Sequence, residues 1–179
     1  MPTQTPDRGA GKPSDVLADR KQLESKLCHE LSQSEHSALA QPRREARRLG
    51  DTPPGDVLRG IAAHARAMRP RLDALLAHRS SRRGMRIGAL FGELFSLTRH
   101  LFADRLIDTE RSYRGTLLGL DHGADLVRML AAIAALDHDH DLAVFCQDWL
   151  AGRLPLLERA RNELAWFVRE PAVALATPR

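Results

Sequence analysis

Five side chains of the kinds that bind transition metals lie at helical spacings in the second half of the chain. Glu93 and His100 are seven residues apart, and His122 and Asp125 are three apart, so each pair falls on one side of a helix. Glu110 lies between the two pairs. If the two flanks face each other, their carboxylates and imidazoles would form a cluster able to bind a transition metal such as iron or manganese.

The alternative is a solvated flank held by ion pairs along a single helix. Glu110 lies four residues before Arg114, and Asp125 lies three residues before Arg128, which are the spacings at which opposite charges pair on a helix. We favour this alternative over a metal site, which stays a hypothesis.

A run of alternating Asp and His, Asp137 to Asp141, also has the residue types of a metal site. Consecutive residues in a turn rarely converge on one ion, and an aspartate before a helix has a capping role of its own. We therefore expect a polar turn in which Asp139 or Asp141 caps the next helix.

A basic cluster, Arg43, Arg44, Arg47 and Arg48, follows the first helical stretch. Such a cluster could bind nucleic acid or another anionic surface. However, no aromatic residues interleave with it, and basic residues at a helix C-terminus are expected from the helix dipole alone. We therefore expect nucleic acid not to be a partner.

Three glycines, Gly115, Gly119 and Gly123, recur every fourth residue in the stretch from Glu110 to Asp137. Each glycine inside a helix costs roughly 0.5–1 kcal/mol relative to alanine. Three on one face predict a groove where another helix backbone packs closely, with a ligand groove as the less favoured alternative. Polar neighbours such as Asp121 argue against contact with lipid.

Apolar residues at alternating spacings of three and four predict helices throughout, and no stretch alternates as a strand does. The first helix has a thin apolar stripe, so we expect it to dock loosely at an edge. A break near Asp108, with Thr109 as N-cap, divides two long helical stretches that would otherwise be continuous. The expected helices cover residues 14–40, 56–78, 85–107, 110–137 and 142–169.

The domain plan follows from these helices. We expect a disordered tail over 1–13, an N-terminal helix and basic linker over 14–49, a helical bundle over 50–170 and a second tail over 171–179.

Composition fits an ordinary helical domain. The chain has 179 residues, 4% aromatic content and a formal net charge of +4, a balance that excludes no partner by itself. No signal-peptide core or membrane-length apolar run is present. We expect Cys28 and Cys146 to be buried in a reducing compartment, and cytoplasmic is the default location.

The stretch from Leu101 to Phe167 resembles the ferritin-like superfamily, in particular the small bacterial stress-associated proteins of the YciE/YciF type. The resemblance rests on the polar turn at 137–141, the closing helix from Leu142 and one helical pattern. That pattern consists of Asp104, Leu106, Ile107, Glu110, Tyr113 and Leu117. The resemblance implies a four-helix bundle able to hold two metal ions, which requires Glu-x-x-His on two helices. The sequence contains no Glu-x-x-His.

Together these observations predict an all-α, up-and-down four-helix bundle of the ferritin-like kind with an additional N-terminal helix. The leading hypothesis is a non-enzymatic bacterial protein with a structural or stress-associated role, forming homo-oligomers and not binding a membrane. One alternative is a di-metal-binding protein or oxidase that uses iron or manganese. Another is a basic adaptor that binds nucleic acid or a protein partner of unknown identity.

Overall fold

The computed structural model describes residues 13–83 and 108–177, and within those ranges the chain is helical, with short turns and no strand. The expected helix over 85–107, with Glu93 and His100, lies outside the described residues. The described helices are α1 (Pro13–Leu49), α2 (Pro53–Arg83), α4 (Thr109–Leu136), α5 (His140–Asn162), α6 (Leu164–Arg169) and α7 (Pro171–Ala174).

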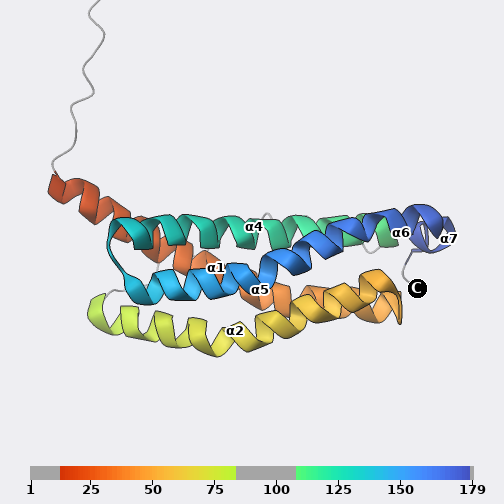
Figure 1. Ribbon diagram of the computed structural model, residues 1–179, viewed down its shortest axis with the longest axis horizontal. Coiled ribbons are helices and arrows are strands. Elements are labelled where there is room, and N and C mark those ends of the chain that lie inside the picture. The colour runs from red at the N-terminus through yellow and green to blue at the C-terminus, as the bar shows by residue number, and fades with distance from the viewer. Residues whose placement is uncertain (1–12, 84–107, 178–179) are drawn as a thin grey trace, which may run out of the picture.

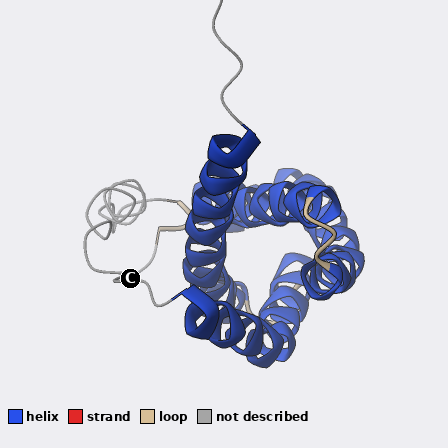
Figure 2. Ribbon diagram, turned by 90° about the vertical axis from the view of Figure 1, so that its left-hand side faces the viewer, coloured by secondary structure: helices blue, strands red, loops and turns tan. Residues whose placement is uncertain are grey.

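The four long helices pack side by side around a common core (Figures 1 and 2). Going around the bundle, α1 contacts α2, α2 contacts α5, α5 contacts α4, and α4 contacts α1. Every neighbouring pair is antiparallel, whereas α2 ends at the end of the bundle opposite to the start of α4 (Figure 1). The all-α prediction is confirmed. Helices α2 and α4 run in the same direction (Figure 1), and the stretch over 85–107 expected to run between them lies outside the described residues, so the up-and-down order stays a prediction.

Helix α1 differs most from the sequence-based expectation. It continues through Pro42 to Leu49 as one helix of 37 residues, so the expected linker after residue 40 is helical. The helix is followed by Gly50, whose φ of 65° is the left-handed conformation that glycine accepts just after a helix C-terminus. The helix does not dock loosely at an edge: Leu31 is fully buried and Leu49 is 5% exposed.

The two predicted boundaries around α4 are present, with one change of residue. Helix α4 begins at Thr109, one residue earlier than expected, and its N-cap is Asp108 in place of Thr109: the Asp108 carboxylate accepts from the Arg111 amide at 2.9 Å. Asp139 caps α5 by accepting from the Leu142 amide at 3.0 Å. Cys28 and Cys146 are both buried, as predicted. The expected C-terminal tail instead begins with the short helix α7.

Close helix packing occurs at only one of the three glycines of α4. A side chain at Gly123 would meet the Ser34 hydroxyl of α1 at 2.7 Å. At Gly115 and Gly119 no atom of the described chain lies within 4 Å of that position, and Gly119 is exposed. Residues four apart drift about 40° around a helix of 3.6 residues per turn. The row of glycines therefore rotates away from α1.

Tyr113 joins α4 to the end of α5. Its side chain is fully buried, and its hydroxyl donates to the Ala160 carbonyl at 2.8 Å. Helix α5 ends at Asn162, so this carbonyl is among the last four, which have no partner within the helix. Burial raises the pKa of the Tyr113 hydroxyl well above its usual value, which keeps it a donor.

We expect Tyr113→Phe to lower the free energy of unfolding by about 0.5–1.5 kcal/mol, because it removes one buried hydrogen bond and keeps the ring against Phe167. Urea unfolding followed by circular dichroism measures this. An unchanged midpoint would mean that water replaces the hydroxyl.

Candidate functional site

Three glutamates lie on the buried face of α1. Glu24, Glu35 and Glu45 are 6%, 3% and 6% exposed, respectively. They share one stripe, with spacings of three and four, with Cys28, Leu31, Ala38, Pro42 and Leu49. Buried carboxylates are costly unless they are paired, and each of the three is hydrogen-bonded to an arginine.

The central pair crosses the middle of the bundle. Arg153 of α5 donates through Nη2 to both carboxylate oxygens of Glu35 on α1, at 3.0 and 2.9 Å. Arg153 is 1% exposed. Because α1 and α5 lie diagonally across the bundle, this ion pair occupies the space between the four helices.

Two rings enclose the Arg153 guanidinium. Its Nε donates to Nδ1 of His64 on α2 at 3.1 Å, so the neutral ring carries its proton on Nε2. Its Cζ lies 4.6 Å from the centre of the Trp149 ring, within the range of a cation–π contact. The Trp149 indole N–H makes no hydrogen bond of normal geometry with the described residues, but it lies close enough to Glu35 to favour the ionised carboxylate.

Burial dominates the electrostatics of the central pair. It raises the pKa of Glu35 although the Arg153 charge lowers it, and it lowers the pKa of Arg153 although Glu35 raises it. For both groups, the free-energy cost of removing the charge from water is therefore larger than the stabilisation by the partner's charge. A pair of this kind is weak evidence for added stability, and it restricts which packing arrangements the helices can adopt.

His64 gives the bundle a defined response to acid. Burial, followed by the nearby Arg153 charge, lowers the pKa of His64 from 6.5 to about 4. The unfolded chain therefore binds more protons than the folded chain between these values. The stability contributed by neutral His64 is complete above pH 6.5 and is lost as the pH falls toward about 4. Glu35 opposes this, because its raised pKa favours the fold as it becomes protonated.

We expect His64→Gln to flatten the loss of stability between pH 6.5 and about 4, since glutamine does not titrate. Urea midpoints of both proteins across this range provide the measurement. Parallel profiles for the two proteins would show that His64 titrates normally in the fold.

A second buried glutamate, Glu24, lies toward the N-terminal end of α1. Glu24 accepts from Nε of Arg79 on α2 at 2.7 Å, and the same guanidinium donates to Asp139 at 2.5 Å. Since Asp139 also caps α5, this arginine ties three helices together.

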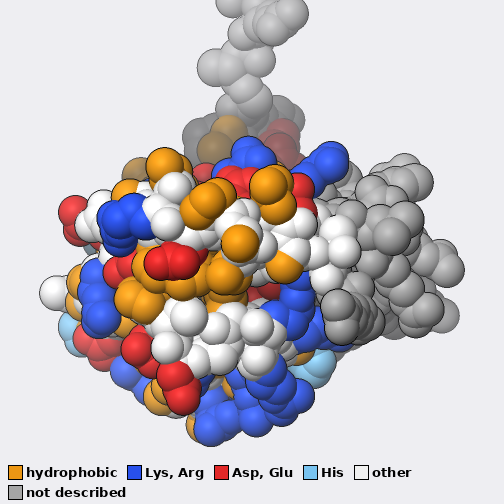
Figure 3. Space-filling model, turned by 90° about the vertical axis from the view of Figure 1, so that its right-hand side faces the viewer, with side chains coloured by type: hydrophobic (Ala, Val, Ile, Leu, Met, Phe, Trp, Pro, Cys, Tyr) orange, Lys and Arg blue, Asp and Glu red, His pale blue; other side chains and the backbone are white. Residues whose placement is uncertain are grey.

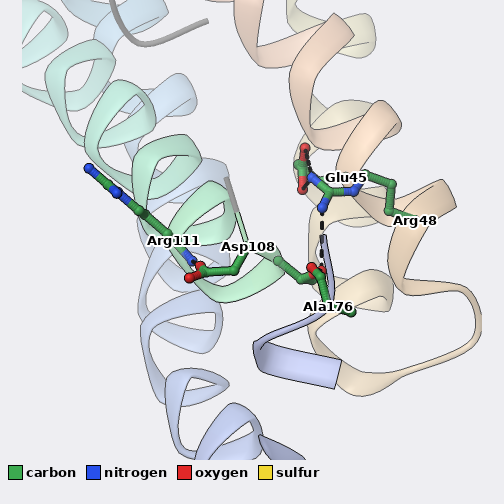
Figure 4. Close-up of polar contacts among 6 residues, drawn as sticks. Glu45, Arg48, Asp108, Arg111 and Ala176 are labelled. Carbon is green, nitrogen blue, oxygen red and sulfur yellow. Dashed lines mark hydrogen bonds and ion pairs between the residues drawn. The ribbon is translucent and has the colours of Figure 1, made fainter. Parts of the chain in front are cut away.

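The third buried glutamate organises the end of α1 (Figure 4). Glu45 pairs with Arg48, which also donates to the Thr109 hydroxyl at 3.3 Å. Thr109 in turn donates to the Ala176 carbonyl through its hydroxyl at 2.8 Å and through its amide at 3.0 Å. These contacts join α1, the start of α4 and the C-terminal segment.

The metal-site candidates that the structure describes do not converge. His122 and Asp125 are exposed, and Asp125 pairs with Arg128 at 2.8 Å. Glu110 pairs with Arg114, so the ion-pair alternative accounts for both carboxylates. Within residues 13–83 and 108–177, no group of three His, Cys, Asp or Glu side chains could hold a metal ion.

The polar turn has structural partners, whereas among the described residues the basic cluster has one only for Arg48. In the polar turn, Asp137 pairs with Arg20 at 3.0 Å while Asp139 acts as the cap described above. In the basic cluster, Arg43, Arg44 and Arg47 are exposed on the last turns of α1, whereas Arg48 reaches inward.

The buried ion pairs are the part of the site that the sequence analysis missed. The glutamates lie at core positions of a helix whose apolar stripe was too thin. That gap in the stripe, filled by acidic residues at the same spacing, is the signal that could have identified them.

Comparisons of the chain with protein-family models, with curated proteins and with solved structures find no match. None of the described helices combines the length and apolar character needed to cross a membrane.

Proposed function

We propose that this chain is a non-enzymatic helical-bundle protein with a structural or stress-associated role, and that it acts through its outer surface. The observation that carries the proposal is the Glu35–Arg153 ion pair on the bundle axis. Bundle enzymes and metal proteins bind their ligands in the core between facing helices. Here a guanidinium, a carboxylate and two rings fill that position.

The helix order supports a ferritin-like fold as part of this proposal. Ferritin-like bundles have one long crossover connection. Helices α2 and α4 run in the same direction, so the end of α2 and the start of α4 lie at opposite ends of the bundle (Figure 1), as helices on either side of such a connection do.

The residues at the centre do not fit the two metal ions that a ferritin-like fold implies. The Glu-x-x-His motif has a glutamate three residues before its histidine, but the residue three before His64 is Ile61. Arg153, which donates to His64, adds a positive charge beside it. A buried cation beside Glu35 competes with a metal ion for the carboxylate.

Metal analysis tests this part of the proposal. Protein purified without an affinity tag, from cells supplied with iron and manganese, should carry far less than one metal ion per chain. Stoichiometric metal that Glu35→Gln abolishes would overturn the proposal. Metal lost in Glu110→Ala or His122→Ala would instead favour the di-metal alternative at the residues that the sequence pattern indicates.

The outer face of α4 supports self-association. Leu118, Met129 and Leu136 are 63%, 46% and 65% exposed. Their separations of eleven and seven residues are close to whole numbers of turns, so they form one stripe along the helix. Identical stripes on two copies can pack together about a two-fold axis.

We expect Leu118→Gln combined with Met129→Gln to convert an oligomer to a monomer, because the change makes the stripe polar. Light scattering after size-exclusion chromatography measures the mass. Val168→Gln, at a residue 81% exposed on α6, is the matched control and should leave the mass unchanged. A wild-type protein that is monomeric at high concentration would exclude self-association.

A further inference from the structure

Four exposed arginines lie on the outer surface of α1 and α2 without an acidic partner among the described residues. We call Arg43, Arg44, Arg47 and Arg66 the arginine ridge. Arg69 of α2 contacts His36 of α1 at 3.0 Å, which joins the outer flanks of the two helices. Arg43 lies two turns after His36 on α1, and Arg66 lies about one turn before Arg69 on α2. Because the two helices are antiparallel, both arginines lie toward the same end of the bundle from the His36–Arg69 contact.

The ridge contains an uncompensated charge. Its four arginines equal the formal net charge of the whole chain, +4, so the remaining residues are balanced. Several other exposed arginines have acidic partners, such as Arg71 with Asp148, Arg128 with Asp125 and Arg161 with Asp121. Exposed Arg111, Arg159 and Arg169 lie on α4, α5 and α6, away from the ridge on α1 and α2. In the end view of Figure 3, basic side chains gather along the lower edge, the side on which α2 lies in Figure 1.

The chemistry of the surrounding surface selects among anionic partners. A membrane surface is usually bound by basic residues combined with exposed apolar side chains. The exposed large apolar residues of α1 are Val16, Leu17 and Leu23, at its other end, and α2 has none in its described part. Single-stranded nucleic acid is bound by aromatic residues that stack on bases, and residues 13–83 contain no Phe, Trp or Tyr.

We propose that the arginine ridge binds the phosphate backbone of double-stranded nucleic acid without reading its sequence. Guanidinium groups pair well with phosphate, and backbone contacts alone give binding that is independent of sequence. The proposal departs from the expectation drawn from the sequence, which placed Arg43, Arg44 and Arg47 in a linker. On a continuous helix Arg43 and Arg47 are held about 6 Å apart along the axis, by the rise of 1.5 Å per residue.

Fluorescence anisotropy of a labelled mixed-sequence DNA duplex, titrated with the full chain, tests the proposal. Binding should weaken steeply between about 50 and 200 mM salt, with a log–log slope of about −3 for three to four phosphate contacts. The ridge variant, with Arg43, Arg44, Arg47 and Arg66 all changed to Gln, should bind at least about tenfold more weakly at low salt.

The control variant changes Arg71, Arg114, Arg128 and Arg161 to Gln, which removes the same charge from arginines that have acidic partners. It should keep affinity within about twofold and keep the salt slope. Equal weakening by both variants would reduce the effect to net charge and overturn the proposal. So would absence of duplex binding at low salt, or ridge-dependent binding to vesicles containing phosphatidylserine without binding to DNA. The single variant Arg47→Glu tests the same surface with one substitution, and an unchanged circular dichroism spectrum would show that it is folded.

Discussion

Replacing Arg153 with methionine should lower the free energy of unfolding by about 3–5 kcal/mol. The substitution leaves the Glu35 carboxylate, which is 3% exposed, in the bundle centre without the Arg153 nitrogen that donates to both of its oxygens. Methionine retains much of the volume beside Trp149, so the loss reports the unpaired charge more than a cavity. Urea unfolding at neutral pH, followed by circular dichroism, provides the measurement.

Two further variants separate the charge from the packing. The double variant Glu35→Leu with Arg153→Met should recover most of the loss, because replacing both ions with apolar side chains is often neutral or stabilising. Arg161→Met removes an arginine from an exposed pair with Asp121 and should cost less than about 1 kcal/mol. If Arg153→Met costs no more than Arg161→Met, the central pair is not desolvated as the structure indicates. The loss should also shrink at acidic pH, since the raised pKa of Glu35 lets it become neutral there.

The sequence was sufficient for the features that depend on local patterns. Leucine and alanine at spacings of three and four predicted α4, because a helix that packs in a core needs an apolar stripe. The polar run at 137–141 predicted the turn and the Asp139 cap, since capping requires only a short side chain before the first helical turn.

The helix that the sequence analysis placed at the edge contributes all three buried glutamates. An apolar-stripe argument counts Glu24, Glu35 and Glu45 as outward-facing residues, which makes α1 look poorly amphipathic. Burial of a glutamate depends on a partner, and Arg153 is 118 residues away from Glu35. The packing of the helices decides which arginine meets each glutamate, so the spacing of the glutamates on α1 does not identify their partners.

The spacing of the glycines in the sequence likewise does not show which of them contact another helix. Their spacing identified Gly115, Gly119 and Gly123 as a set, but only Gly123 faces α1 closely. The glycine whose missing side chain matters most to the bundle centre is Gly152, next to Arg153. It belongs to no repeat, and its role depends on His64 of a different helix.

Gly152→Ala should therefore lower the free energy of unfolding by about 1–3 kcal/mol, as overpacking of a core does. A Cβ at this position would lie 2.5 Å from Nε2 and 2.7 Å from Cδ2 of His64. The ring cannot move away freely, because its Nδ1 accepts from Arg153 at 3.1 Å. The clash should outweigh the gain of about 0.5–1 kcal/mol that alanine normally brings to a helix. Chemical unfolding of the variant and the wild type measures the difference.

Two comparisons show whether the His64 ring is the cause. Gly119→Ala meets no atom of the described chain within 4 Å and should stabilise the protein by about 0.5–1 kcal/mol. In a background of His64→Ala, Gly152→Ala should lose most of its cost, because the ring that the new Cβ would meet is absent. A loss that persists without the ring would place the obstruction elsewhere. A gain in the wild-type background would show that His64 can leave Arg153 at little cost, and the two rings would then not hold the guanidinium on the bundle axis.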